Sequence, residues 1–256
     1  LDSLFIQGVH NPLLRDSAAK ASCAITTNNK KANHGGDHYM IPFFFGEDWT
    51  KCLPLVALQY HDVEIRIKCR DGYTPAGSPQ VWGNYIYLDT DERSFFVDNE
   101  HEILITQTQH QLANSGDTEF DLSYFNHPIK SLHLVSGKAA GDDWDTEYTF
   151  GKSSLYINGV ALFEDTSAVY HHTVVPEMHS TDLPDDILED LPTFTWPFCV
   201  NLSKTQPTGT LNFSRIDNAK LTVTSPTGGN GLHRVYAVNY NILRIQKGMG
   251  GVAFGN

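Results

Sequence analysis

The chain has 256 residues, of which 40% are hydrophobic and 11% aromatic, so it can bury one large or two modest cores. Its 18 Lys and Arg residues against 30 Asp and Glu residues give a formal charge of −12, which opposes direct binding to a phosphate backbone. No stretch reaches the roughly 20 apolar residues of a membrane-spanning helix, so we expect no such helix.

Short alternating segments follow one another along the chain. Residues 62–69 are the clearest, because apolar side chains such as Val63 and Ile65 fall on one face of a strand and charged ones on the other. A change of face after Ile242 predicts a bulge in the last strand. Further strands are expected at residues 41–45, 85–88, 103–108, 130–135, 198–202 and 235–245.

The strongest local signal lies at residues 154–163, where Asn158-Gly159 separates two apolar alternations. This pair favours a type I′ turn, so a β-hairpin is expected there. Helix signals are weaker and are limited to residues 16–23 and 185–191.

The spacing of these signals predicts an all-β architecture. Strand candidates recur about every ten residues with Gly, Pro, Asn and Asp between them, which is typical of a sandwich or barrel. Residues 71–78, DGYTPAGS, have the composition of a linker, so we place a boundary there, between residues 1–70 and residues 79–256.

Residues 206–218, QPTGTLNFSRIDN, predict a turn followed by a corner between two strands. In the second strand, Ala219 and Leu221 would face one way and Lys220 the other. We expect Arg215 and Asp217 to fix the corner through a charge-assisted hydrogen bond, either to each other or to nearby backbone.

Twelve histidines invite a metal hypothesis. The tightest group contains His171, His172, Glu177 and His179. On a strand, the side chains of His171 and His172 would point to opposite faces and could not share one ion without a bend. His34 and His38 form no better group. We therefore expect polar surface or interface histidines and no metal site.

Two other patterns resemble ligand sites without completing them. The acidic residues 142–147 suggest calcium, but an EF-hand that starts at Asp143 puts Tyr148 at the Gly position and Ser154 at the bidentate Glu position. A looser cation loop and a solvated acidic loop both remain open. Residues 248–253 match G-x-G-x-x-A, but too few residues follow for the helix that a dinucleotide site needs.

No pattern of a serine hydrolase, zinc protease or P-loop enzyme is present, so we expect no catalytic residues, no cofactor and no enzymatic activity. The N-terminus lacks the pattern of a signal peptide, and we expect an unsecreted chain with reduced, mostly buried thiols. The cysteines are Cys23, Cys52, Cys69 and Cys199. Two sequons, at Asn201 and Asn212, are glycosylation candidates that require a secretory route.

The run at residues 206–218 closely resembles the QPSGT-NFSRIDN stretch of the major capsid proteins of large eukaryotic DNA viruses, the phycodnavirus- and iridovirus-like double jelly-roll proteins. Four other segments resemble the same family in the same order along the chain. They are residues 41–65, with IPFFF and CLPLVALQYHDVEI; residues 124–130, with HPIK; the Asn-Gly hairpin at residues 155–163; and residues 236–251, which resemble the final strand.

The resemblance implies a structural shell protein with two eight-stranded jelly rolls, three chains of which form a pseudo-hexagonal capsomer. It implies a homotrimer in the virion, assembled in the host cytoplasm, whose partners are neighbouring capsomers and minor capsid proteins. It implies no direct contact with nucleic acid and a position close to an internal membrane without spanning it. The residues expected to form the structural motif are Gln206, Pro207, Gly209, Asn212, Phe213, Ser214, Arg215, Ile216 and Asp217.

The chain departs from the family in its first part, where too few residues precede the ALQYH segment for a whole barrel. We expect residues 1–70 to be the C-terminal part of the first jelly roll and residues 79–256 a complete second one. The rest of the first barrel would lie upstream in a longer gene product or on a separate chain. Two alternatives are a carbohydrate- or receptor-binding minor shell protein, with Trp82, Trp144 and Tyr170 stacking on sugars, and a cupin-type metal enzyme.

Overall fold

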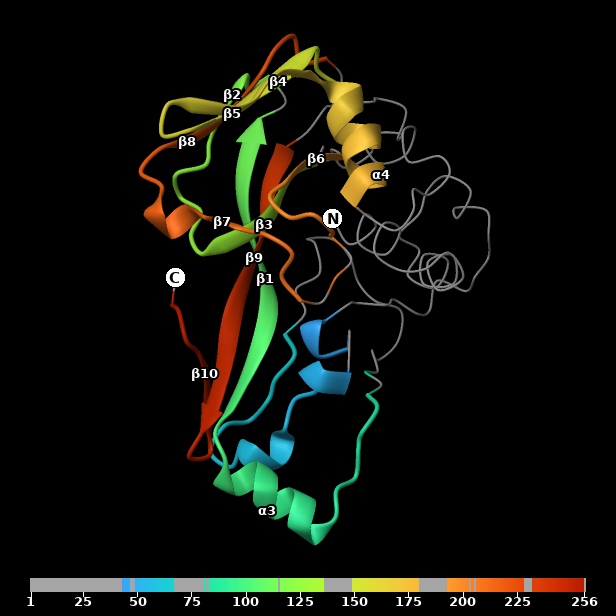
Figure 1. Cartoon of the computed structure of the whole chain (residues 1–256), viewed down its shortest axis with the longest axis vertical. Helices are drawn as coiled ribbons and strands as arrows, with labels where there is room; N and C mark the ends of the chain where they lie inside the picture. Colours follow the sequence, from blue (N-terminus) through green and yellow to red (C-terminus); the bar gives the residue numbers. More distant parts are fainter. Residues whose placement is uncertain are drawn as a thin grey trace, which may run out of the picture.

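Antiparallel sheets form the upper part of the molecule, and a long two-stranded ribbon runs down from them to a group of short helices (Figure 1). The computed structural model describes residues 43–46, 49–66, 81, 83–114, 116–135, 149–179, 193–202, 204, 206–227 and 232–255. The predicted helices at residues 16–23 and 185–191 lie outside these ranges.

Two sheets face each other in the upper part. The first has the strand order β1 (His101–Asn114), β9 (Leu232–Gln246), β3 (Pro128–Val135) and β6 (Thr193–Pro197). The second has the order β2 (Glu119–Asp121), β8 (Ala219–Val223), β4 (Lys152–Ile157) and β5 (Val160–Ser167). Two short strands, β7 (Leu211–Asn212) and β10 (Met249–Val252), extend the first sheet beside β3 and β9.

The eight main strands form one jelly roll, in which β1, β3, β6 and β9 pack against β2, β4, β5 and β8. The alternation of each strand sends one set of side chains between the sheets, where they form a single apolar core. Fully buried members of this core come from both sheets and include Leu132, Leu134, Trp196, Leu155 and Leu221. The all-β jelly-roll prediction is therefore confirmed.

Strands β1 and β9 pair without a register shift from His101 opposite Ile245 to Asn114 opposite Leu232. The predicted bulge after Ile242 is therefore wrong. The register shift lies instead in β3, between Ile129 and Ser131. Apolar residues occupy both faces of β9, because Val235, Ala237 and Ile245 are buried on one face and Val238 and Tyr240 on the other.

The strands expected at residues 103–108, 130–135 and 235–245 are confirmed in β1, β3 and β9. Those expected at residues 41–45, 62–69, 85–88 and 198–202 are wrong wherever the structure describes them. Phe44–Gly46 is a 3-10 turn, residues 61–66 and 83–89 have no regular secondary structure, and residues 198–200 bend. No strand lies beside them within the described ranges, so Val63 and Ile65 remain 48% and 42% exposed.

Helix α3 (Thr90–Asp98) was not predicted, although its start has a clear sequence signature. The Asp89 carboxylate accepts a hydrogen bond from the Glu92 N–H at 2.9 Å, and the Glu92 carboxylate accepts one from the Asp89 N–H at 3.0 Å. This reciprocal arrangement is a capping box, which D-x-x-E at residues 89–92 indicates. Two more 3-10 turns, Trp49–Lys51 and Leu55–Ala57, precede α3 in the lower part.

Candidate functional site: the motif corner and the junction below the barrel

Residues 206–218, here called the motif corner, contact three other parts of the barrel. At its start, Thr208 exchanges two hydrogen bonds with the backbone of Asn201, each 3.0 Å long. Gly209 has a φ of 147°, and a Cβ on it would lie 2.7 Å from the carbonyl oxygen of Phe198. Only glycine fits there, because both the conformation and the close backbone approach exclude a side chain.

The middle of the motif corner joins the turn that leads into β3. The Asn212 side chain accepts a hydrogen bond from the Ser214 N–H at 3.1 Å and starts a 3-10 turn, Phe213–Arg215. The Ser214 hydroxyl accepts from the His127 N–H at 2.8 Å, and the Phe213 N–H donates to the His127 carbonyl at 3.0 Å. The Phe213 ring is buried in the core, so this turn anchors the corner both by packing and by hydrogen bonds.

The end of the motif corner is held by the hairpin between β4 and β5. Asn158 and Gly159 have φ values of 49° and 80°, the pair of positive values that a type I′ turn requires. The Asn158 Oδ1 accepts hydrogen bonds from the N–H groups of Asp217 and Asn218, at 3.2 and 3.1 Å, and the Asn158 N–H donates to the Asn218 carbonyl at 2.7 Å. One asparagine thus serves as both turn residue and clamp.

The expected role of the Arg215 and Asp217 side chains is wrong in the structure. Both residues are exposed, and among the described residues neither side chain makes a hydrogen bond or an ion pair. The Asp217 backbone is held by Asn158, so a neutral amide fixes the corner where the sequence suggested a charge. Of the other motif residues, Ile216 packs against the core, whereas Gln206 and Pro207 are exposed.

A second site lies below the barrel, where the ALQYH segment meets the C-terminal turn. Gly248 has a φ of 78°, and a Cβ on it would lie 2.6 Å from the ring of Tyr60. The Tyr60 N–H donates to the Gly248 carbonyl at 3.0 Å, and the Gly250 N–H donates to the His61 ring at 3.1 Å. A Cβ on Gly250 would meet Leu58 at 2.8 Å. The glycines allow residues 58–61 to lie directly on the backbone of this turn.

The β1–β9 ribbon carries two apolar layers on the same face. The upper layer contains Val235 and Ala237, which belong to the barrel core. The lower layer contains Ile103, Ile105 and Ile245, which are buried farther down the ribbon, outside that core. In this lower part of the ribbon, β10 pairs with β9, and the turns of residues 49–61 lie beside the ribbon (Figure 1).

Between the two apolar layers lies a belt of amide side chains. The Asn241 Nδ2 donates to the Gln107 Oε1 at 2.9 Å and to the Phe254 carbonyl at 2.8 Å. The Gln109 Nε2 donates to the Asn239 Oδ1 at 3.0 Å. The two buried asparagines of the belt, Asn239 and Asn241, therefore have partners, and the belt separates the barrel core from the junction.

The strand expected at His171 and His172 is absent, so the premise that their side chains point to opposite faces is wrong. His171 and His172 lie in a π-helical turn, Tyr170–Val174, which leads into α4 (Val175–His179). Both are buried, and each hydrogen-bonds a different carbonyl of β6. Among the described residues, no three His, Cys, Asp or Glu side chains are placed to hold a metal ion. His34, His38 and residues 142–147 lie outside those ranges.

The remaining candidates have ordinary structural positions. Residues 248–252 form a turn and β10, with no helix N-terminus for a pyrophosphate. The Tyr170 ring lies edge-on to His171 at 5.2 Å, while Trp82 and Trp144 are outside the described residues. Cys52 is half-buried, and Cys199 is a buried thiol whose pKa is raised by burial. Asn201 and Asn212 are both half-buried. No helix in the described part of the chain is long and apolar enough to span a membrane.

The geometry is that of a jelly-roll building block whose motifs serve packing and connection. Comparison with known proteins gives its family. The family model described as "Large eukaryotic DNA virus major capsid protein" matches residues 92–251, and the model "Major capsid protein N-terminus" matches residues 10–89. The chain therefore belongs to the major capsid protein family of large eukaryotic DNA viruses.

Individual relatives agree with this assignment. The major capsid protein of Pyramimonas orientalis virus is 36% identical over 244 residues, and that of Paramecium bursaria Chlorella virus 1 is 28% identical over 291 residues. Each alignment covers 84% of this chain, but only 60% and 65% of the two relatives. The chain thus spans less than two thirds of the length of either relative.

Solved structures resemble the whole fold. The crystal structure of PBCV-1 VP54, fitted into a cryo-EM reconstruction of the virophage Sputnik, is 25% identical with a TM-score of 0.68, and the match covers 100% of this chain and 78% of that one. A quasi-atomic model of the PBCV-1 virus capsid gives a TM-score of 0.64 at 25% identity, covering 94% and 79%.

Proposed function

We propose that this chain forms the outer shell of a large icosahedral double-stranded DNA virus, as a trimeric, pseudo-hexagonal capsomer. The observation that carries the proposal is an eight-stranded jelly roll in a chain that belongs to the major capsid protein family. A sandwich of two sheets around one core suits a building block that must hold its shape while several of its surfaces contact neighbours.

The junction below the barrel supports the arrangement of two barrels in one subunit. In our proposal, residues 1–70 belong to the first jelly roll, residues 71–78 are a linker, and residues 79–256 form the second jelly roll. Residues 58–61 lie on the C-terminal turn of the second unit, so the two parts are joined by contacts as well as by the chain. Such a junction would fix the angle between barrels, which a regular tile requires.

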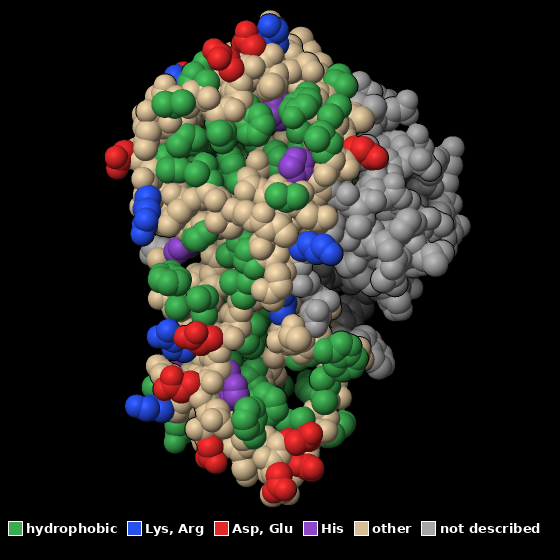
Figure 2. Space-filling view, in the orientation of Figure 1, with side chains coloured by type: hydrophobic (Ala, Val, Ile, Leu, Met, Phe, Trp, Pro, Cys, Tyr) green, Lys and Arg blue, Asp and Glu red, His purple; other side chains and the backbone are tan. Residues whose placement is uncertain are grey.

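The surface charge supports a position away from the genome. The net charge is −12, and the face in Figure 2 shows Lys and Arg side chains at separate places, interleaved with acidic ones. Acidic side chains gather at the lower tip, where α3 lies in Figure 1. We therefore propose that the partners are neighbouring capsomers and minor capsid proteins, with a location in the virion after assembly in the host cytoplasm.

The solution mass of the intact gene product tests the trimer. Light scattering or native mass spectrometry of the complete protein should give three times the subunit mass across a range of concentrations. A protein that stays monomeric at high concentration would contradict the proposal. A glycan array run on the same sample addresses the receptor-binding alternative, which requires hits that a Tyr170→Ala variant loses.

A further inference from the structure

Segment 168–179 lies along the open edge of the first sheet. Strand β6 ends the order β1-β9-β3-β6, and no other described strand pairs with its outer edge. The His171 Nδ1 lies 3.0 Å from the Thr195 carbonyl oxygen, and the His172 Nδ1 lies 2.8 Å from that of Thr193. Two imidazoles therefore take the place that a neighbouring strand would occupy.

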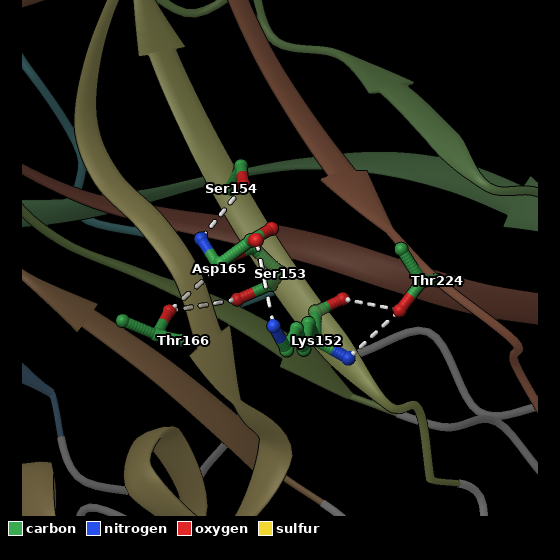
Figure 3. A network of polar contacts seen from close by, with 6 residues as sticks. All are labelled: Lys152, Ser153, Ser154, Asp165, Thr166 and Thr224. Atoms are coloured by element: carbon green, nitrogen blue, oxygen red, sulfur yellow. Dashed lines mark hydrogen bonds and ion pairs between the residues drawn. The ribbon is translucent and has the colours of Figure 1, made fainter.

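The hydrogen bonds of His171 place one hydrogen on the ring, at Nδ1. A carbonyl oxygen only accepts, so Nδ1 carries the hydrogen and donates to Thr195. The Nε2 lies 2.6 Å from the Thr166 hydroxyl, which donates to Nε2 when the ring is neutral and can donate to the Ser153 carbonyl, at 3.2 Å, when it is not. The Thr166 hydroxyl in turn lies 3.3 Å from the Ser153 hydroxyl. Figure 3 shows these two side chains directed toward each other between β5 and β4. One neutral imidazole thus connects β6 of the first sheet with β5 and β4 of the second.

The surroundings of His171 offer little to a positive charge. The residue is fully buried, and its ring stacks on Trp196 at 4.5 Å and meets the edge of Phe163 at 5.7 Å. The described groups that contact it from β5 and β6 are hydroxyls, a carbonyl and aromatic rings, and the titratable groups beside it on its own segment are Tyr170 and His172. The ion pair of Lys152 with Asp165 lies on exposed side chains and does not contact the ring.

We propose that segment 168–179 is an acid-releasable clasp: it stays on the edge of β6 while His171 is neutral, and it detaches on acidification and exposes that edge. The far end of the clasp, at His179, is held to the loop after β6 by a hydrogen bond from the Leu202 N–H to the His179 carbonyl at 2.6 Å. The outward residues Val169 and Met178 are 62% and 67% exposed, so the segment is peripheral to the core.

The size of the effect follows from linkage. Burial lowers the pKa of His171 from 6.5 to about 4, against the opposing effect of the Thr195 hydrogen bond. Because the pKa is depressed in the closed form, closure is fully stable above pH 6.5 and loses stability as the pH falls toward 4. We take the pKa of His171 as 6.5 in the open form and about 4 in the closed form. The equilibrium constant for opening should then rise about 20-fold from pH 7 to pH 5 and about 100-fold from pH 7 to pH 4.

Hydrogen exchange of the full chain at pH 7 and pH 5, corrected for intrinsic rates, tests the clasp. The amides of the clasp and of β6 should exchange more readily than those in the centre of β3 at both pH values, and their protection should fall about 20-fold at pH 5. In a His171→Gln variant this pH dependence should disappear, and a matched control, His110→Gln on the exposed face of β1, should retain it.

Two results would overturn the proposal: clasp amides as strongly protected as those of β3, which would mean that they exchange only when the whole barrel unfolds, or an unchanged pH dependence in His171→Gln. If His171→Gln does not fold, an NMR titration of wild-type His171 gives the answer. A pKa near 4 with local loss of protection would support the clasp, and a pKa near 6.5 would refute it.

Discussion

The turn at Gly248 offers a sharp test of how the lower part of the molecule is held together. Gly248→Ala places a side chain on a residue with a φ of 78°, which costs about 1–2 kcal/mol. The new Cβ would also lie 2.6 and 2.8 Å from two ring carbons of Tyr60. That ring is 74% exposed and has room to move, so the overlap should add only about 1 kcal/mol. The expected loss of unfolding free energy is about 2–3 kcal/mol.

A double-mutant cycle separates the two contributions. In a Tyr60→Ala background the overlap is absent, so Gly248→Ala should cost only about 1–2 kcal/mol, and the coupling energy between the sites should be about 1 kcal/mol. Gly251→Ala is the matched control, because a Cβ there meets nothing within 4 Å and should change stability by less than about 0.5 kcal/mol. Urea unfolding of the full chain measures all four variants. A coupling energy of zero would show that Tyr60 does not rest on this turn.

Three further predictions concern the barrel itself. Asn158→Ala should cost about 2 kcal/mol in urea unfolding, because it removes the acceptor of two backbone N–H groups and puts Ala at a φ of 49°. Asn158→Gly also removes the acceptor but avoids the backbone strain, so it should cost about half as much, and a cost near zero for Asn158→Gly would refute the clamp. Arg215→Ala should change stability by less than about 0.5 kcal/mol, and a larger loss would indicate a partner that the described residues lack. Burial holds the pKa of His133 at about 3, so its contribution to stability is complete above pH 6.5 and is lost as the pH falls toward 3. His133→Gln should therefore reduce the loss of stability between pH 7 and pH 5 by about 2 kcal/mol, and an unchanged pH dependence would show that His133 is solvated.

Local sequence patterns predicted the barrel well because its strands pair with one another within the chain. In β1, β3 and β9, apolar and polar residues alternate because one face of each strand packs against the core. The Asn-Gly pair specifies the hairpin through its backbone preference alone. The same alternation at residues 62–69 did not produce a strand in the described part. Periodicity reports a preference for extended backbone, and a strand also needs a partner beside it.

The sites were harder to predict, because spatial neighbours decide them. The sequence predicts that the side chains of Arg215 and Asp217 fix the corner. The side chain that holds the backbone of Asp217 is instead that of Asn158, which lies 59 residues earlier in the chain. The contact of Tyr60 with Gly248 joins residues from opposite ends of the chain in the same way. His171 and His172 were assigned to opposite faces of a strand, whereas a π-helical turn brings both to the edge of β6.

Quantitative mass spectrometry of purified virus particles tests the shell assignment most directly. A major capsid protein that tiles the icosahedral faces must be the most abundant protein of the particle, with three copies in each capsomer. We predict that peptides from residues 92–251 are found at that abundance. If the chain is absent from purified particles, or present at only a few copies per face, the account of it as the major shell protein is contradicted.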